Sequence, residues 1–198
     1  MIQTFNTAET YREECTPVLE TERLVLRAPR IEDAKTVAAL ANDRRVAENT
    51  LRIPHPYTFA DAMQWISAAN TRPGEKTFLI LREDDVVGAC GFDLREGPEP
   101  EVGYWIGVPY WSQGYAAEAT SALIDYAFTV GDHAALRAGA RVSNPASRRV
   151  LEKCGFQWDG VGLIRIHSIG SSVPSDRFIL SRENWLATRQ RQAERASR

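Results

Sequence analysis

EVGYWIGVPYWSQGYAAE, residues 101–118, is the stretch that decides the predicted fold. Residues 101–107 have the pattern of a strand, and after a turn rich in Pro, Gly and aromatic residues a helix is expected from Gln113 or Gly114 through Phe128. The first N–H groups of a helix lack partners within it, and together with the helix dipole they favour an anion such as phosphate. The turn is therefore a candidate phosphate site. A single glycine there is equally explained by the permissive backbone that glycine provides.

The length and composition indicate one ordinary globular domain. The chain has 198 residues, of which 43% are hydrophobic and 25% charged, and its net charge is −2. This balance weighs against a broad basic surface for nucleic acid. The sequence contains no apolar run as long as a membrane span, and its first residues lack the pattern of a secretion signal. We therefore expect a cytoplasmic protein that binds neither nucleic acid nor membranes.

The cysteines predict free thiols in a reducing compartment. Cys15, Cys90 and Cys154 lie far apart, and their odd number leaves at least one unpaired in any disulfide scheme. A catalytic cysteine is the alternative, but no motif links a histidine to one of these thiols.

Segments on the N-terminal side of this stretch predict a sheet flanked by helices. Residues 1–16 have no clear period, and we interpret them as an arm. Residues 43–57 predict an irregular connection that either shapes a substrate entrance or is a solvated loop. Thr58 and Asp61 have the spacing of a helix capping box. The expected elements are a strand over 19–28, helices over 31–42 and 58–70, and a hairpin of strands over 76–83 and 86–95.

Segments on the C-terminal side complete the prediction. Asn144 and Pro145 predict a helix start, and Gly155 predicts its end. The fold class is therefore mixed α/β, or α+β, with helices covering a sheet. We interpret residues 17–186 as one domain and residues 187–198 as a polar tail. The other expected elements are a strand over 135–142, strands within 156–168 and 175–181, and a polar helix over 182–198.

Four segments resemble the GNAT superfamily of acyl-CoA-dependent N-acetyltransferases, and within it the RimJ/RimL-like branch of ribosomal-protein N-terminal acetyltransferases. They are LETERLVLRAPRIEDA (19–34), GYWIGVPYWSQGYAAEA (103–119), NPASRRVLEKCGF (144–156) and DRFILSRENW (176–185). The resemblance implies a mostly antiparallel sheet with helices on both faces. It also implies a splay between the fourth and fifth core strands, here 101–107 and 135–142, and acetyl-CoA as co-substrate within that gap.

The resemblance also implies which residues hold acetyl-CoA. The pantetheine arm would pair with the backbone of the 101–107 strand, and the pyrophosphate would lie on N–H groups at the start of the following helix. Asn144 matches a family asparagine that touches the cofactor arm. The cofactor-binding residues implied in this way are Ile106, Val108, Gln113, Gly114, Tyr115, Ala116, Ala117, Asn144 and Ser147.

Two positions depart from the family pattern. Trp111 lies three residues before Gly114, where the superfamily consensus has Gln or Arg, although the RimJ/RimL-like branch often has an aromatic residue there. Leu151 lies where many members carry a tyrosine that protonates the leaving thiolate. Leucine has no proton to give.

The transfer reaction needs a neutral amine, a polarised carbonyl and a proton for the departing sulfur. Glu101 is the candidate base, acting directly or through water, because strand alternation places it with Gly103 and Trp105 at the mouth of the expected gap. The alternative is a solvated carboxylate at the strand start. A strand N–H is expected to polarise the carbonyl. Ser147, at the position of a serine that donates the proton in the branch, has two interpretations: it donates through its orientation or a relayed water, or it caps the helix and contacts the cofactor.

These features predict direct transfer from acetyl-CoA to a primary amine, with no covalent enzyme intermediate and no metal. The expected acceptor is a protein N-terminal α-amine, and the alternative is a small molecule such as an amino sugar, polyamine or amino acid. Leu151 also leaves open a noncatalytic acyl-CoA-binding or sensing domain. The family and the apolar residues of the final strands are consistent with a homodimer.

Overall fold

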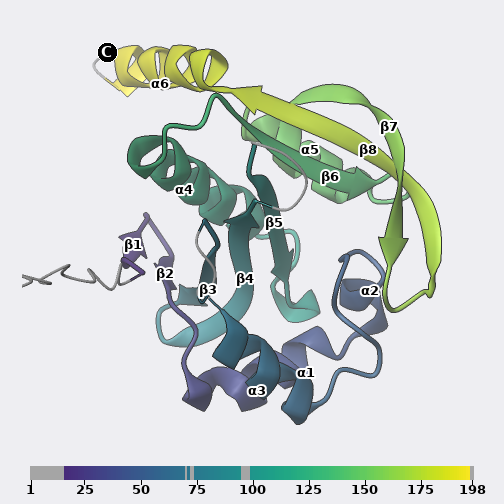
Figure 1. Cartoon of the computed structure of the whole chain (residues 1–198). Coiled ribbons are helices and arrows are strands. Elements are labelled where there is room, and N and C mark those ends of the chain that lie inside the picture. The colour runs from purple at the N-terminus through teal and green to yellow at the C-terminus, as the bar shows by residue number, and fades with distance from the viewer. Residues whose placement is uncertain (1–15, 70, 72–73, 95–98, 197–198) are drawn as a thin grey trace, which may run out of the picture.

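The computed structural model describes residues 16–69, 71, 74–94 and 99–196 as an eight-stranded sheet with helices on both faces (Figure 1). Nearly all of the predicted arm, with Cys15, lies outside these residues. The strands are β1 (Leu19–Glu20), β2 (Val25–Arg27), β3 (Lys76–Arg82), β4 (Asp85–Asp93), β5 (Glu101–Ile106), β6 (Ala135–Arg141), β7 (Gln157–Ile166) and β8 (Ser171–Ser181). The helices are α1 (Ala34–Ala41), α2 (Arg44–Ala47), α3 (Phe59–Ala68), α4 (Tyr115–Val130), α5 (Pro145–Lys153) and α6 (Arg182–Ala196), with 3-10 turns at Ile31–Asp33 and Val108–Tyr110.

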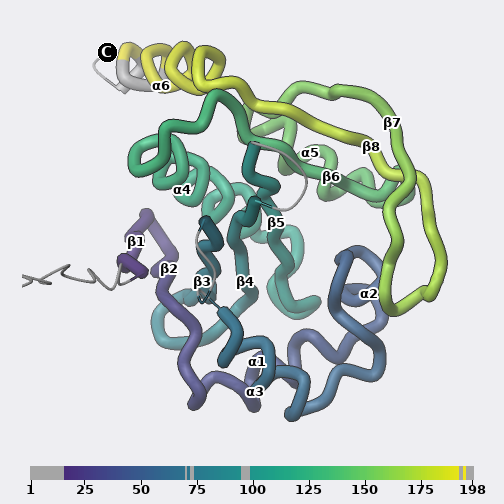
Figure 2. Tube along the Cα trace, in the orientation of Figure 1, coloured from purple at the N-terminus to yellow at the C-terminus, as the bar shows by residue number. Residues whose placement is uncertain are grey.

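The strand order is β1-β2-β3-β4-β5-β6-β8-β7. Among the described strands every neighbouring pair is antiparallel except β5 and β6. The hairpin of β7 and β8 forms one edge, and its tip reaches the segment around α2 (Figure 2), where His167 N donates to Leu51 O at 3.0 Å. These observations confirm the predicted mixed, mostly antiparallel fold class.

The parallel pair separates soon after it forms. The register of β5 and β6 contains Glu101 opposite Arg137 and Val102 opposite Ala138, whereas β6 and β8 pair over the full range Ala135–Arg141. Residues 103–106 of β5 therefore border a gap. The predicted splay is confirmed. The two strands that form it are the expected fourth and fifth strands, and they are numbered β5 and β6 here because the first expected strand is divided into β1 and β2.

The two faces of the sheet carry separate hydrophobic clusters. Along β3, Phe78 and Ile80 pack with α4 and α5, while Leu79 and Leu81 pack with α1 and α3. Successive side chains of a strand point to opposite faces, so a strand covered on both faces is apolar at every position. This arrangement explains the continuous apolar run of residues 78–81.

Two segments differ from the prediction. The expected single strand over 19–28 is divided into β1 and β2 by a turn in which Thr21 N donates to Leu24 O at 2.9 Å. The expected irregular connection over 43–57 contains α2, which begins where the Asp43 carboxylate accepts from Arg45 N at 2.8 Å. Both differences arise from hydrogen bonds that hydrophobic periodicity does not encode.

The predicted helix ends are confirmed. Thr58 N donates to the Asp61 carboxylate at 2.7 Å and Asp61 N donates to Thr58 Oγ1 at 3.2 Å, which completes the capping box of α3. Gly155, with φ +92°, ends α5 in a Schellman motif in which Phe156 N donates to Leu151 O at 3.1 Å.

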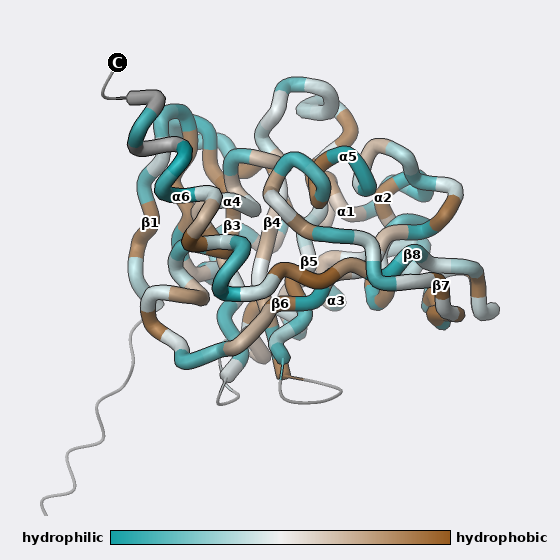
Figure 3. Tube along the Cα trace, turned by 90° about the horizontal axis from the view of Figure 1, so that it is seen from above, coloured by the Kyte–Doolittle hydropathy of each residue, from teal (hydrophilic) through white to brown (hydrophobic). Residues whose placement is uncertain are grey.

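The C-terminal helix α6 is mostly hydrophilic, as its teal colour in Figure 3 shows. Trp185 attaches it to the body of the protein, since its ring lies 5.0 Å from that of Phe128 and its Nε1 donates to Asp125 at 2.7 Å. Residue 187, the expected start of the polar tail, lies inside this helix. None of the helices in the described part of the chain has the length and apolar composition needed to cross a membrane.

Candidate active site

The start of α4 has the backbone geometry of an anion site. Gly114 is the N-cap and has φ +85°, a conformation that favours glycine. The Gly114 carbonyl accepts from Glu118 N at 3.1 Å, so the N–H groups of residues 115–117 lie in the first turn, before intrahelical bonding begins. A side chain at residue 114 would also crowd the Arg23 guanidinium, which lies 3.2 Å from the position of the added Cβ.

This turn forms one wall of a cavity of about 520 Å³, here called the cofactor-side cavity. Most of the predicted cofactor residues line it: Ile106, Gly114, Tyr115, Ala116, Ala117, Asn144 and Ser147. The predicted residues Val108 and Gln113 lie in the turn itself and are not among the lining residues. The Gln113 side chain instead folds back, with Nε2 donating to Pro109 O at 3.3 Å.

The charges of this cavity suit a polyanion. Arg45, Arg149 and Lys153 line it, and no carboxylate lies among its described lining residues. Cationic side chains and helix N-termini are the groups that bind phosphates in proteins. The residues present therefore fit the pyrophosphate and phosphate groups of acetyl-CoA.

Glu118, in the first turn of α4, has a structural role. Its carboxylate accepts from Thr21 Oγ1 at 2.6 Å and from Arg23 Nε at 2.8 Å, which ties the turn between β1 and β2 to α4. Burial raises the pKa of Glu118, but the hydrogen bonds from Thr21 and Arg23 outweigh burial and hold the pKa below its ordinary value. The ion pair between Arg23 and Glu118 thus supports the phosphate turn from outside.

The backbone of β5 faces the splay at alternate residues. Gly107 N donates to Val87 O at 2.8 Å and Arg137 N donates to Pro100 O at 2.9 Å, so even-numbered residues direct their N–H and C=O groups toward the β6 side. Ile106 is one of these residues, and its carbonyl accepts from Trp111 Nε1 at 2.6 Å. Trp111, which departs from the consensus, therefore fixes the turn that follows β5.

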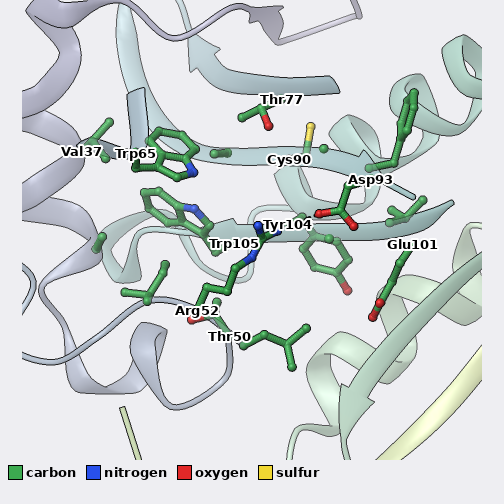
Figure 4. Close-up of a pocket in the computed structure, with 18 of the residues that line it drawn as sticks. Val37, Thr50, Arg52, Trp65, Thr77, Cys90, Asp93, Glu101, Tyr104 and Trp105 are labelled. Carbon is green, nitrogen blue, oxygen red and sulfur yellow. Dashed lines mark hydrogen bonds and ion pairs between the residues drawn. The ribbon is translucent and has the colours of Figure 1, made fainter. Parts of the chain in front are cut away.

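A second cavity of about 570 Å³, here called the acceptor-side cavity, lies between β3–β5 and the segment of α1, α3 and residues 49–54. Figure 4 shows Trp65 and Trp105 at one end of it and Asp93 and Glu101 at the other. Glu101, the predicted base, therefore faces this cavity and not the cofactor-side cavity. Sequence reasoning missed Asp93 and Trp65, because no local motif marks them.

The acceptor-side cavity has acidic walls. Asp61, Glu75, Asp93 and Glu101 line it, against Arg52 as the one cation among its described lining residues. Asp93 lies directly opposite Glu101 in the register of β4 and β5, and its carboxylate accepts from Arg52 Nη2 at 3.1 Å. The two cavities thus differ in the sign of their charged residues, which are cations in the cofactor-side cavity and mainly carboxylates in the acceptor-side cavity.

Residues 48–51, the roof of the acceptor-side cavity, are held by β6 and by the tip of the β7–β8 hairpin. Arg141 Nη1 of β6 donates to Glu48 O at 2.6 Å, and His167 at the hairpin tip donates its N–H to Leu51 O. Residues 49–54 of the 43–57 segment line this cavity, and their role as a substrate entrance stays a prediction.

The two cavities meet at a shared wall. Five residues line both of them: Asn49, Thr50, Tyr104, Trp105 and Ser147. Tyr104 Oη lies 2.8 Å from Ser147 Oγ and 3.1 Å from Ser147 O. Burial raises the pKa of the Tyr104 phenol above its ordinary value, and the hydrogen bond to Ser147 offsets part of the increase.

Ser147 does not cap α5. The cap is Asn144, whose Oδ1 accepts from Ser147 N at 3.1 Å. Because Asn144 caps the helix, the Ser147 hydroxyl is not used as a cap, and it pairs with Tyr104 on the shared wall. The interpretation of Ser147 as the capping residue is therefore corrected.

The structure also explains two other positions. The Leu151 side chain is fully buried, packed with β6, β8 and α4, so this position faces the core and not a cavity. Cys90 lines the acceptor-side cavity, but burial raises the pKa of its thiol and leaves it protonated at neutral pH. Tyr104 is a phenol that the sequence analysis missed, and its hydroxyl lies beside that of Ser147 on the shared wall.

Comparison with known families identifies the fold and the chemistry. The Acetyltransferase (GNAT) domain family matches residues 23–157, more than half of the chain. The chain belongs to the GNAT acetyltransferase family. This GNAT protein is accordingly an N-acetyltransferase with acetyl-CoA as its co-substrate.

Similar proteins agree with the RimJ/RimL-like branch. The GNAT protein is 32% identical over 149 residues to Uncharacterized N-acetyltransferase p20 of Bacillus licheniformis, covering 72% of this chain and 84% of p20. It is 32% identical over 87 residues to the ribosomal-protein-serine acetyltransferase of Escherichia coli, covering 43% of this chain and 49% of that relative. The structure of Mycobacterium smegmatis RimJ in complex with CoA-disulfide has a TM-score of 0.76 at 18% identity and covers 85% of this chain and 88% of RimJ, which shows a shared fold.

Proposed function

We propose that this GNAT protein transfers the acetyl group directly to a primary amine, and that its acceptor is the α-amine of a peptide or protein N-terminus. The observation that carries the proposal is an acidic cavity that shares a wall with a cationic cavity. Acetyl-CoA supplies an acetyl group activated as a thioester. With the polyanion on the cationic side, the acceptor amine reaches the shared wall from the acidic side.

The acidic walls favour amines without a neighbouring carboxylate. A carboxylate is repelled by like charges, whereas an ammonium group is attracted to them. A free amino acid carries a carboxylate two bonds from its nitrogen, but in a peptide that group is a neutral amide. The ribosomal-protein-serine acetyltransferase named above supports a protein acceptor by its own name.

Glu101 is proposed as the base that takes the amine proton. Tyr104 marks the shared wall, and three residues of strand separate the two Cα atoms by roughly 10 Å. Glu101 therefore acts through a chain of water molecules in the acceptor-side cavity. The N–H groups of β5 that face the splay, such as that of Ile106, are proposed to polarise the carbonyl.

A small-molecule amine is the second candidate acceptor. The observation that favours it is the roof formed by residues 48–51, whose backbone is held by Arg141 and His167. A cavity of about 570 Å³ lies within the usual range for small ligands, about 300–1,000 Å³. A polyamine would satisfy the same acidic walls.

The test is thiol release from acetyl-CoA with matched acceptors. We expect a serine-starting peptide to accelerate release at least about tenfold more than free serine, because only free serine has a carboxylate next to its amine. Serinamide should lie in between, because it lacks this carboxylate but also lacks the rest of the peptide. The same peptide with a blocked N-terminus should give only the background rate. If spermidine exceeds every peptide, the small-molecule acceptor replaces the peptide. If no amine accelerates release, the proposed function is wrong.

Gly114→Glu tests the phosphate turn in the same assay. A glutamate at residue 114 would have an unfavourable φ, and its carboxylate would occupy the turn where the pyrophosphate is proposed to bind and repel anions from it. We therefore expect acetyl-CoA binding to fall below detection in calorimetry. Gly160→Glu is the matched control, because Gly160 also has positive φ (+114°) and has open space around it, away from both cavities. Equal binding by Gly114→Glu and the wild type would contradict the assignment of the turn.

A further inference from the structure

Tyr104 and Ser147 lie on the wall where the two cavities meet. They are 43 residues apart in the sequence and come from different elements, β5 and α5. We propose that their two hydroxyl groups form a proton relay, with Tyr104 supplying through Ser147 the proton that the leaving sulfur of CoA receives. The relay rests on the proposed function, because it serves the step in which the acetyl group is transferred.

The hydrogen-bond geometry allows two arrangements of the protons. Each hydroxyl has one hydrogen, and the Ser147 carbonyl can only accept. When Tyr104 donates to this carbonyl, 3.1 Å away, the Ser147 hydroxyl is free to donate to Tyr104 Oη. When Tyr104 donates to Ser147 Oγ, 2.8 Å away, the Ser147 hydrogen is free to point into the cavities. A small rotation of the phenol hydrogen thus converts a resting arrangement into a donating one.

The relay and the proposed base together balance the step. The amine nitrogen bonds to the carbonyl carbon and loses one proton, through water, to Glu101. As the bond between the carbonyl carbon and the sulfur breaks, its electron pair stays on sulfur. Ser147 gives its hydroxyl proton to that sulfur, and Tyr104 gives its phenol proton to Ser147 Oγ. Tyr104 is left as a phenolate, which takes a proton from water after the products leave. Ser147 touches the reacting sulfur, whereas Tyr104 acts through Ser147 and is a positioning and proton-supplying residue.

A phenol makes the serine an effective donor. Serine alone would end the step as an alkoxide, whereas the negative charge of the relay ends on a phenol, whose ordinary pKa is about 10. Burial raises the pKa of Tyr104, so the phenol is protonated at neutral pH before each turnover, and it is a weaker acid than an exposed phenol. Asn144 holds Ser147 in place through the cap of α5. Leu151, at the position where many family members carry a proton-donating tyrosine, is fully buried in the core and supplies no proton donor there.

Tyr104→Phe is the first test, because it removes only the hydroxyl. We expect kcat to fall about 100-fold, within the range for general acids, with KM for acetyl-CoA changed by less than about twofold. Ser147→Ala should cause a similar loss, and the double variant should lose no more than the larger single loss, since both act in one relay. Tyr126→Phe is the matched control, because Tyr126 packs against the hydrophobic core and lines neither cavity.

The second test does not depend on turnover. Thiolate absorbance of bound CoA is measured against pH, with desulfo-CoA as the blank. The Ser147 hydroxyl, polarised by the hydrogen bond from Tyr104, stabilises the charged form of the sulfur, so we expect the bound thiol to have a pKa about one unit lower in the wild type than in Tyr104→Phe. CoA affinity measured by calorimetry at low pH, where the thiol is neutral in both proteins, should be equal.

The outcomes separate the relay from the proposed function. If the wild type transfers acetyl groups and Tyr104→Phe keeps its kcat within about twofold, the relay is wrong and the transferase stands. Additive losses for the two single variants would equally overturn the relay, since they would then act independently. If the wild type binds acetyl-CoA but accelerates no transfer, the proposed function and the relay fail together. A lower thiol pKa in the wild type with non-additive losses supports the relay.

Discussion

At the scale of single residues, Gly103 leaves room in the acceptor-side cavity. It lies on the face of β5 that also carries Glu101 and Trp105, and a Cβ added there would meet no heavy atom within 4 Å. Gly103→Val is expected to preserve the fold, since valine suits a strand, and to raise the acceptor KM at least about tenfold by filling the cavity. Steady-state kinetics with the best acceptor measures this change.

Gly103→Val should weaken only acceptor binding, whereas Gly114→Glu should weaken acetyl-CoA binding. Gly103 is absent from the lining of the cofactor-side cavity, so acetyl-CoA affinity of the valine variant should match that of the wild type in calorimetry. An unchanged acceptor KM would place the acceptor outside this cavity. A loss of acetyl-CoA binding would show that the two cavities are not separate.

The contact between Tyr104 and Ser147 could not be predicted from the sequence. Strand alternation predicts that Glu101, Gly103 and Trp105 share a face, which the structure confirms, but it gives no partner for Tyr104 on the other face. The partner lies 43 residues further along, and only the packing of α5 beside the splay brings the two hydroxyls together.

At the scale of elements, the N-cap of α5 links stability to the site. Asn144→Ala removes the acceptor of the Ser147 N–H bond, and we expect the free energy of unfolding to fall by about 1 kcal/mol. Asn144→Ser is the control, because serine caps helices nearly as well as asparagine. Urea denaturation followed by circular dichroism measures both variants. Equal midpoints for the alanine variant and the wild type would show that the cap contributes nothing.

Elements defined by local signals were predicted more accurately than elements defined by distant contacts. The ends of α3 and α5 follow from Thr58 with Asp61 and from Gly155, all within a few residues of the helices that they bound. The division between β1 and β2 depends on Thr21, whose hydroxyl donates to Glu118, 97 residues away. No local pattern in residues 19–28 carries that information.

At the scale of the whole molecule, the carboxylates predict loss of stability in acid. Hydrogen bonds from Thr58 lower the pKa of Asp61; in Asp33 the bonds from Arg27 and Arg30 outweigh the effect of burial and give a lowered pKa. The pKa of Glu118 is also below its ordinary value. Groups with lowered pKa values bind fewer protons in the folded than in the unfolded state, so stability falls as the pH decreases.

The expected window lies from about pH 5 downward, where unfolded carboxyl groups begin to take up protons. The free energy of unfolding should be nearly constant between about pH 6 and 8 with respect to these three groups, and should decline steadily below about pH 5. Glu118→Gln should be less stable than the wild type at pH 7 by about 1 kcal/mol, a value discounted for the exposure of Arg23, and the two should converge as the pH falls through the lowered pKa of Glu118. Parallel loss in both proteins at every pH would contradict the role given to Glu118.

The short pairing of β5 with β6 predicts that acetyl-CoA stabilises the folded protein as well as serving as its co-substrate. Among the described strands, β5 and β6 pair in register only at Glu101 and Val102, so an extended molecule pairing along the open edge of β5 would act as an additional strand. A ligand that binds only the folded state at 100 times its Kd adds about 2.7 kcal/mol of stability. Resistance of the purified protein to proteolysis is therefore expected to rise with the concentration of acetyl-CoA.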